Sequence, residues 1–320
     1  MIRFLIPALL FSLTLISTSG AQTPESYIVL ERHSRKVLLA SGSEYKRPIA
    51  SLSHMVTAKV ALDWTKASAT STTTMLVVPQ HGFYSGIDNP LGLQAGDQLS
   101  MRDALYAVIL GEDSVSAMTL ATHVGSKLLN RRQLAGDPQS MFVNEMNNLA
   151  SSLAMHNTRF YLPSGGDTSG RSNVSTASDV ARLSLALSTD TAYGFYAKQK
   201  QRSLKVLKRD EREVRLEVLN SNKLLRRKMK VVGLKAGSSA MAGQCASLLV
   251  DKYSYVKKLP TGEEQVTPVQ MILVVLGSSD VEAFAKNLIP QGWSQYETWR
   301  NGGYLASSDR REFLKIALGQ

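Results

Sequence analysis

The chain has 320 residues, of which 43% are hydrophobic and 20% charged, a balance that suits one large or two modest globular domains and excludes fibrous and disordered proteins. It carries 37 basic and 26 acidic residues, and this formal net charge of +11 favours anionic surfaces, glycans or acidic peptides as partners. Cys245 is the single cysteine, so the fold cannot contain an internal disulfide, and its apolar neighbours predict a buried side chain without chemistry.

The first 21 residues have the pattern of a cleavable signal peptide. Arg3 gives a short basic start, residues 4–16 are apolar, and residues 17–21 are small. The apolar run is too short to span a bilayer, and the small residues suit cleavage after Ala21, although an uncleaved anchor is the alternative. We therefore expect a soluble, periplasmic protein with 36 basic and 26 acidic residues, a net charge of +10, and no nucleic-acid partner.

The remaining chain predicts strands at both ends and helices between them. Two β-prone runs, residues 27–31 and 36–40, predict a hairpin, and residues 51–62 predict a helix that is apolar all round and therefore buried. Further helices are expected at residues 102–109, 114–124, 141–153 and 176–187. Further strands are expected at residues 214–219, 230–234, 245–250 and 269–276, with a turn at 259–262.

This order of elements predicts an α/β (α+β) fold. One domain is expected over residues 22–292, with a helical insertion at about 65–200, and residues 293–320 are expected to pack on it as a helical tail. The tail pattern predicts a terminal helix capped by Ser308 or Asp309, with Phe313, Ile316 and Ala317 on one face.

Ser51 and His54 open the buried helix and are the first candidates for chemistry. Side chains three residues apart on a helix share a face, and a hydroxyl beside a base is a workable arrangement for a nucleophile. Serine at a helix start is far more often a cap, so the pair by itself is weak evidence of catalysis.

The sequence around this pair resembles the low-molecular-weight penicillin-binding proteins, the D-alanyl-D-alanine carboxypeptidase/endopeptidase family. Residues 47–58 are similar to that family's Arg-x-Pro-Ala-Ser-x-Thr-Lys-Met-x-Thr-Ala segment. The similarity continues in order through residues 92–93, 96–105, 142–147, 160–166, 175–181, 220–225, 232–237 and 242–245. It implies a β-lactamase/transpeptidase-like fold, in which helices flank a central antiparallel sheet and a helical subdomain is inserted, and a role in peptidoglycan metabolism. The short C-terminal region is most similar to the endopeptidase branch, which lacks the extra β-domain and amphipathic anchor of the carboxypeptidases.

The resemblance implies a serine acyltransferase built on three triplets, Ser-x-x-Lys, Ser-x-Asn and Lys-Thr-Gly. Ser51 stands at the nucleophile position, and His54 replaces the lysine that accepts its proton. The second triplet becomes Gly111-Glu112-Asp113, which removes a relay hydroxyl and exchanges an amide for a carboxylate. The third becomes Lys235-Ala236-Gly237, which keeps the charge that binds substrate but loses another hydroxyl.

These losses predict a periplasmic pseudoenzyme that binds peptidoglycan or a cell-wall enzyme instead of turning over stem peptides. Asp113 could pair with Lys235 or with protonated His54 and repel an incoming D-alanine carboxylate. The alternative is a weakly active or redirected serine hydrolase, a D-alanyl-D-alanine peptidase or an esterase, that uses Ser51 and His54. A Ser51–His54–Asp113 triad is one form of that alternative.

A third possibility is an interaction protein that works through basic residues between positions 198 and 230. Arg226, Arg227 and Lys228 would then contact an anionic wall polymer, a lipid surface or an acidic partner. The alternative is a solvated sheet edge protected by charge. The other histidines show no metal-ligand spacing, so we expect neither a metal nor an organic cofactor.

Overall fold

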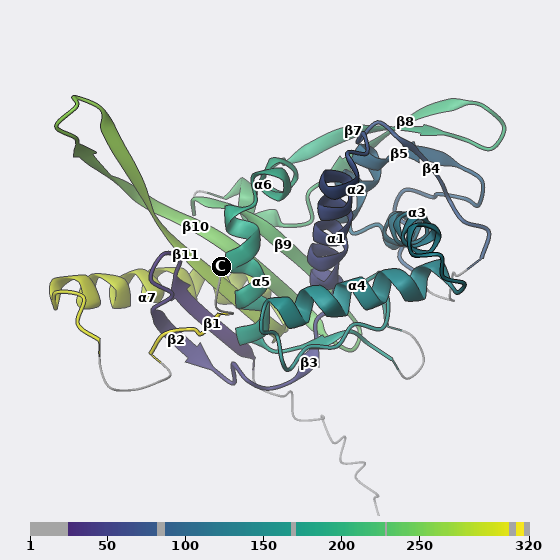
Figure 1. Ribbon diagram of the computed structural model, residues 1–320. Coiled ribbons are helices and arrows are strands. Elements are labelled where there is room, and N and C mark those ends of the chain that lie inside the picture. The colour runs from purple at the N-terminus through teal and green to yellow at the C-terminus, as the bar shows by residue number, and fades with distance from the viewer. Residues whose placement is uncertain (1–24, 82–86, 168–170, 228, 307–311, 317–320) are drawn as a thin grey trace, which may run out of the picture.

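The computed structural model describes residues 25–81, 87–167, 171–227, 229–306 and 312–316 (Figure 1). The expected signal peptide lies outside these residues. Within them, no helix combines the length and the apolar character that crossing a membrane requires.

A five-stranded antiparallel sheet, in the order β2-β1-β11-β10-β9, forms the centre of the molecule. Its strands are β1 (Ser26–Glu31), β2 (Val37–Ser41), β9 (Val231–Ser239), β10 (Gly243–Lys258) and β11 (Glu264–Ser278). Successive side chains of a strand point to opposite faces. On β11, Ile272 and Val274 join the larger core while Met271 and Leu273 join a second core. Because both faces are apolar, helices must cover both.

The larger core lies between the sheet and the helical part of the chain. Its helices are α1 (Ser53–Ser68), α2 (Met101–Ile109), α3 (Ser114–Arg132), α4 (Pro138–Ser152), α5 (Ala177–Thr189) and α6 (Thr191–Ala197). Figure 1 shows α1 running through the middle of this layer, which agrees with its burial on most sides. The predicted hairpin, buried first helix, later helices and strands, and mixed α/β class are thus confirmed.

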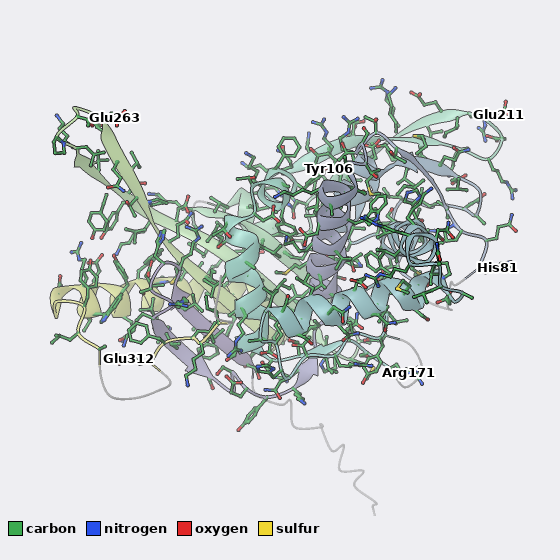
Figure 2. All side chains as sticks on the ribbon, in the orientation of Figure 1. His81, Tyr106, Arg171, Glu211, Glu263 and Glu312 are labelled. Carbon is green, nitrogen blue, oxygen red and sulfur yellow. The ribbon has the colours of Figure 1, made fainter. Side chains whose placement is uncertain are left out.

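A small second sheet, in the order β4-β5-β7-β8, belongs to the helical part of the chain. Its strands are β4 (Met75–Val77), β5 (Gln98–Ser100), β7 (Gln201–Leu207) and β8 (Glu213–Leu219). Figure 2 shows Glu211 at the tip of the β7–β8 hairpin. Two short strands, β3 (Arg47–Pro48) and β6 (Val174–Ser175), pair where the chain enters the first turn of helix, η1 (Ala50–Leu52).

The C-terminal part of the chain differs from the prediction. Helix α7 (Val281–Asn301) covers the second face of the sheet, so the expected boundary at residue 292 falls inside a helix. Residues 312–316 are not helical, since Phe313 forms a β-bridge with Lys36 and the Leu314 N–H donates to the Arg35 carbonyl. The predicted terminal helix is therefore wrong over these residues, because backbone groups at the start of β2 offer them hydrogen-bond partners. Its expected caps, Ser308 and Asp309, lie outside the described residues.

The outer parts of β10 and β11 continue beyond the sheet as a projecting hairpin. Residues 254–258 of β10 pair with residues 264–268 of β11, and Glu263 lies at the tip of this projection (Figure 2). Nearer the centre, Cys245 is completely buried, and burial raises the pKa of its thiol to about 11. This agrees with the prediction of a buried cysteine.

Candidate active site

Ser51 lies in the short helix η1, directly before α1, with only 1% of its surface exposed. The residue before it, Ala50, has a φ of 45°, in the left-handed region that alanine seldom adopts. The turn is held by the Ser53 hydroxyl, which donates to the Ala50 carbonyl at 2.8 Å. A strained turn fixed in this way sets the direction in which the Ser51 side chain leaves the helix.

The loop at residues 163–166 packs directly on the backbone of Ser51. A Cβ built on Gly165 would lie 2.4 Å from the Ser51 Cα, so a side chain at this position would displace the serine. Two polar side chains hold the loop in place: Thr57 Oγ1 donates to the Pro163 carbonyl at 2.5 Å, and Asn173 Nδ2 donates to the Ser164 carbonyl at 2.8 Å. The loop therefore forms one wall of the site.

His54 is completely buried and neutral. Its Nε2 accepts the Gly165 N–H at 3.3 Å, so Nε2 carries the lone pair and Nδ1 carries the proton. Nδ1 makes no hydrogen bond with any described residue. Burial and the charge of Lys235 lower the pKa of His54 from 6.5 to about 3, and a polar contact with the Val108 backbone, too poorly aligned to count as a hydrogen bond, opposes them only in part. The acceptor nitrogen, Nε2, is thus bonded to the loop at residues 163–166, and no hydrogen bond joins His54 to Ser51.

Lys235 lies on β9 and is 1% exposed. Its Nζ donates to the Ala236 carbonyl at 2.7 Å and to Ser221 Oγ at 3.1 Å. Burial lowers its pKa, although the nearby carboxylate of Glu112 acts in the opposite direction. A buried ammonium group attracts an anion strongly unless a neighbouring carboxylate already neutralises its charge.

Glu112 supplies the carboxylate that neutralises Lys235. Its Oε1 lies 3.8 Å from the Lys235 Nζ. The position of its other oxygen is shown by Gly237: a Cβ built there would lie 3.0 Å from Glu112 Oε2 and 3.2 Å from Ser51 Oγ. The carboxylate therefore spans the space between the lysine and the nucleophile position, at the edge of β9.

Asp113 lies at the start of α3, and the expectation that it pairs with Lys235 or His54 is wrong. Its Oδ1 accepts the Ser116 N–H at 2.6 Å and its Oδ2 accepts the Leu91 N–H at 3.3 Å, so the side chain caps α3. It bonds neither to Lys235 nor to His54, and the Ser51–His54–Asp113 triad is therefore not assembled. A buried carboxylate needs hydrogen-bond donors, and the free backbone N–H groups at the start of α3 supply them. Asp113 therefore caps the helix instead of contacting His54.

Gly111 and Ala236 occupy the positions of the two missing hydroxyls. A Cβ on Gly111 would approach Val218 Cγ1 to 2.9 Å and the Ala107 carbonyl to 3.0 Å, so these neighbours leave no room for a side chain at this position. The structure thus brings Ser51, Lys235 and Gly237 together around one edge of β9, with His54 behind the serine. Sequence reasoning missed Glu112, whose only signal was an acidic residue at the variable position of the second triplet, and it missed Gly165, which carried no chemical signal.

The expected basic surface is partly engaged within the chain. Arg227 Nη2 pairs with Glu282 Oε1 at 2.7 Å, and Arg226 Nη2 donates to the Asn220 carbonyl at 3.1 Å. Lys228 lies outside the described residues. Among those residues, no group of three or more histidine, cysteine, aspartate or glutamate side chains has the arrangement of a metal site.

A family profile described as D-alanyl-D-alanine carboxypeptidase matches residues 16–252 of the chain. The chain belongs to the D-alanyl-D-alanine carboxypeptidase family. The carboxypeptidase DacC of Escherichia coli strain K12 is 29% identical over 284 residues, which cover 85% of this chain and 62% of DacC. The D-alanyl-D-alanine endopeptidase of the same strain is 29% identical over 184 residues, which cover 54% of this chain and 51% of the endopeptidase. The chain thus spans less than two thirds of the length of these relatives.

Solved structures of penicillin-binding proteins share the fold of this D-alanyl-D-alanine carboxypeptidase family member. The Streptomyces K15 DD-transpeptidase superimposes with a TM-score of 0.65 at 21% identity, covering 87% of this chain and 96% of the transpeptidase. Penicillin-binding protein D2 from Listeria monocytogenes, solved with cefotaxime bound, gives a TM-score of 0.62 at 22% identity, covering 88% of this chain and 96% of that protein. The predicted transpeptidase-like fold is confirmed.

Proposed function

We propose that this chain is a catalytically impaired homologue of the D-alanyl-D-alanine peptidases, which binds wall peptide or a wall enzyme during peptidoglycan metabolism instead of turning over stem peptides. The proposal includes export to the periplasm, supported by the signal-like pattern of residues 1–21. The relatives in the comparison act on D-alanyl-D-alanine, as their names state.

The observation that carries this proposal is the state of His54, the residue at the position of the family's proton-accepting lysine. With a pKa lowered to about 3, its imidazole is a weak base at neutral pH. Its Nε2 is occupied by the Gly165 N–H at 3.3 Å, and it makes no bond to Ser51. A serine hydroxyl without a hydrogen-bonded base is a poor nucleophile, and loss of a general base typically costs about a hundredfold or more in rate.

Three further features support impairment. Gly111 offers no hydroxyl to relay a proton, and Ala236 offers none to a substrate carboxylate. The Glu112 carboxylate also stands beside Ser51 and Lys235, where a reacting acyl group would have to approach to within about 3–3.5 Å of the serine oxygen. A scaffold that keeps the cleft but blocks its chemistry is suited to binding.

A weak or redirected serine hydrolase is the second candidate, because His54 is neutral and therefore in its base form at physiological pH. If the imidazole turned so that Nε2 faced the Ser51 hydroxyl in place of the Gly165 N–H, the two side chains would form a Ser–His pair. This candidate predicts acylation at Ser51 by a reactive acyl donor.

The test is covalent labelling of the mature protein with a fluorescent penicillin, read by intact mass. The parent, Ser51→Ala and, as a matched control, Ser238→Ala on β9 are incubated for minutes to hours, and circular dichroism establishes that each is folded. Impairment predicts no adduct on any of the three proteins. An adduct on the parent and on Ser238→Ala, but not on Ser51→Ala, would refute impairment and favour the hydrolase.

Two further measurements test location and partners. Export predicts that the protein from the periplasmic fraction begins at Gln22, whereas retention of Met1 would refute cleavage. If the basic residues bind the wall, neutralising Arg226, Arg227 and Lys228 together should weaken co-sedimentation with isolated peptidoglycan at low salt. If neither this substitution nor added salt alters the amount of protein that co-sediments, the basic-surface proposal is refuted.

A further inference from the structure

Strand β2 lies at one edge of the central sheet, and a part of the chain that is distant in sequence covers the start of that edge. The Val37 N–H donates to the Glu312 carbonyl at 2.9 Å, and the Leu314 N–H donates to the Arg35 carbonyl at 3.0 Å. Figure 2 shows Glu312 close to β2. The free edge of a sheet presents unpaired N–H and C=O groups that can pair with an extended chain. Residues 312–316 therefore contact β2 in the way that an added peptide strand contacts a sheet edge.

The side chains of this segment make contacts that give such pairing specificity. Glu312 forms an ion pair with Lys36, and the two side chains are only 9% and 15% exposed. The Lys36 Nζ also lies 5.4 Å from the centre of the Phe313 ring. Leu314 is 6% exposed and belongs to the larger core. The β2 edge therefore fits a segment that has an acidic, an aromatic and an aliphatic residue in succession.

Helix α5 also holds the segment, and space remains beside it. Arg182 of α5 donates through Nε to the Lys315 carbonyl at 2.8 Å. A pocket of about 550 Å³ adjoins the segment, and its lining includes the apolar side chains of Ile28 and Val37 and the exposed ring of Tyr45. Because the described residues leave this pocket open, a longer ligand could place further side chains in it.

The segment can leave β2 without unpacking α7. Residues 302–306, which follow the helix, are exposed. Among residues 312–316, Leu314 alone is buried, so release removes a single side chain from the core. A tethered occupant has an effective concentration on the order of 1 mM, and a ligand that makes more contacts can displace it.

We propose that the β2 edge is a docking site for an extended segment of a partner protein, with an acidic, an aromatic and an aliphatic residue in succession, and that residues 312–316 are its resident competitor. A second copy of the chain would offer the same contacts as the resident segment without the advantage of the tether. A partner whose segment also fills the adjoining pocket gains contacts that the resident lacks. The inference goes beyond the proposed function and rests on it only in taking the partner to be a wall enzyme.

The probe is a synthetic peptide with the sequence of residues 309–316, acetyl-Asp-Arg-Arg-Glu-Phe-Leu-Lys-Ile-amide, titrated into the full mature protein by NMR and calorimetry. Leu314→Asp should release the resident segment, so this variant should bind the peptide at least about tenfold more tightly than the parent. Glu312→Lys, which breaks the ion pair and leaves the core intact, should act in the same direction. Leu305→Asp, which introduces the same charge at a side chain that is 76% exposed, should bind like the parent.

A charge exchange at Lys36 identifies the site. Lys36→Glu should release the resident segment by repelling Glu312, and it should repel the glutamate of the peptide for the same reason. A peptide with lysine in place of that glutamate should therefore bind Lys36→Glu at least about tenfold more tightly than the original peptide does. The amide resonance of Val37 should shift on binding, because its N–H lies in the docking edge.

Three results would overturn the proposal: no binding at millimolar concentration by Leu314→Asp and Glu312→Lys proteins that circular dichroism shows to be folded, equal binding by the parent and both variants, or no effect of the charge exchange. A dimeric parent that becomes monomeric in Leu314→Asp, as measured by light scattering, would assign the edge to a second copy of the chain and would also overturn it. Penicillin labelling is read at Ser51. An adduct there would refute impairment and leave docking at β2 standing, whereas failure of docking would leave impairment standing.

Discussion

Acidification should destabilise this protein through His54. The folded-state pKa of about 3 lies below the ordinary value of 6.5, so below pH 6.5 the unfolded chain takes up a proton that the folded chain refuses. Stability from this residue is therefore present above pH 6.5 and declines as the pH falls toward 3. Because pH 5.0 lies about 1.5 pH units below the ordinary pKa of 6.5, lowering the pH from 7.5 to 5.0 should reduce the free energy of unfolding by about 2 kcal/mol.

Urea unfolding of the parent and of His54→Gln, measured at half-unit steps from pH 7.5 to 5.0, isolates this effect. Glutamine keeps an acceptor for the Gly165 N–H but does not titrate. Between pH 7.5 and pH 5.0 the parent should therefore lose about 2 kcal/mol more unfolding free energy than His54→Gln. His156→Gln, which removes an exposed histidine, should follow the parent. The carboxyl groups titrate alike in all three proteins and cancel. If the parent and His54→Gln lost stability in parallel, the burial argument for a neutral His54 would be wrong.

Three other changes test the site by different measurements. Gly165→Ala should cost more than about 2 kcal/mol of unfolding free energy, because its Cβ would lie 2.4 Å from the Ser51 Cα; a midpoint in urea within error of the parent would contradict this. Asp113→Ala should cost about 1–2 kcal/mol through loss of the bond to the Ser116 N–H, while Asp113→Asn should cost little, and equal losses would show that the negative charge matters more than the cap. Cys245, with a pKa raised to about 11 and no exposure, should resist iodoacetamide at pH 8 in the native protein and react fully in urea, as intact mass would show; rapid native labelling would contradict its burial.

The sheet and most helices could be predicted because their periodicity is strong. The buried start of α1 and the alternating strands leave few alternatives once both faces of the sheet must be covered. Helix α7 was missed because Pro290 and Gly292 interrupt its pattern. In the structure, Gly292 lies so close to β1 and β11 that a Cβ would meet Met271 Sδ at 2.6 Å and Val29 Cγ1 at 2.9 Å, so the glycine serves helix–sheet contact instead of ending the helix.

The candidate site was predictable in its residue types but not in its contacts. The order of triplets located Ser51, Lys235 and Gly237, which the fold brings to one edge of β9. It could not show which of two adjacent carboxylates enters the cleft. That choice depends on the φ of 59° at Glu112, which turns its side chain toward Lys235 and leaves Asp113 to cap α3.

The crowded surroundings of Gly111 limit what a single substitution could restore at this position. A serine at that position would place its Cβ 2.9 Å from Val218 Cγ1 and 3.0 Å from the Ala107 carbonyl, so a smaller residue at 218 would relieve only one of the two close contacts. Either substitution alone is unfavourable, since one creates a clash and the other a void in a packed core. A hydroxyl at position 111 is therefore not reached by a single substitution without a less stable protein.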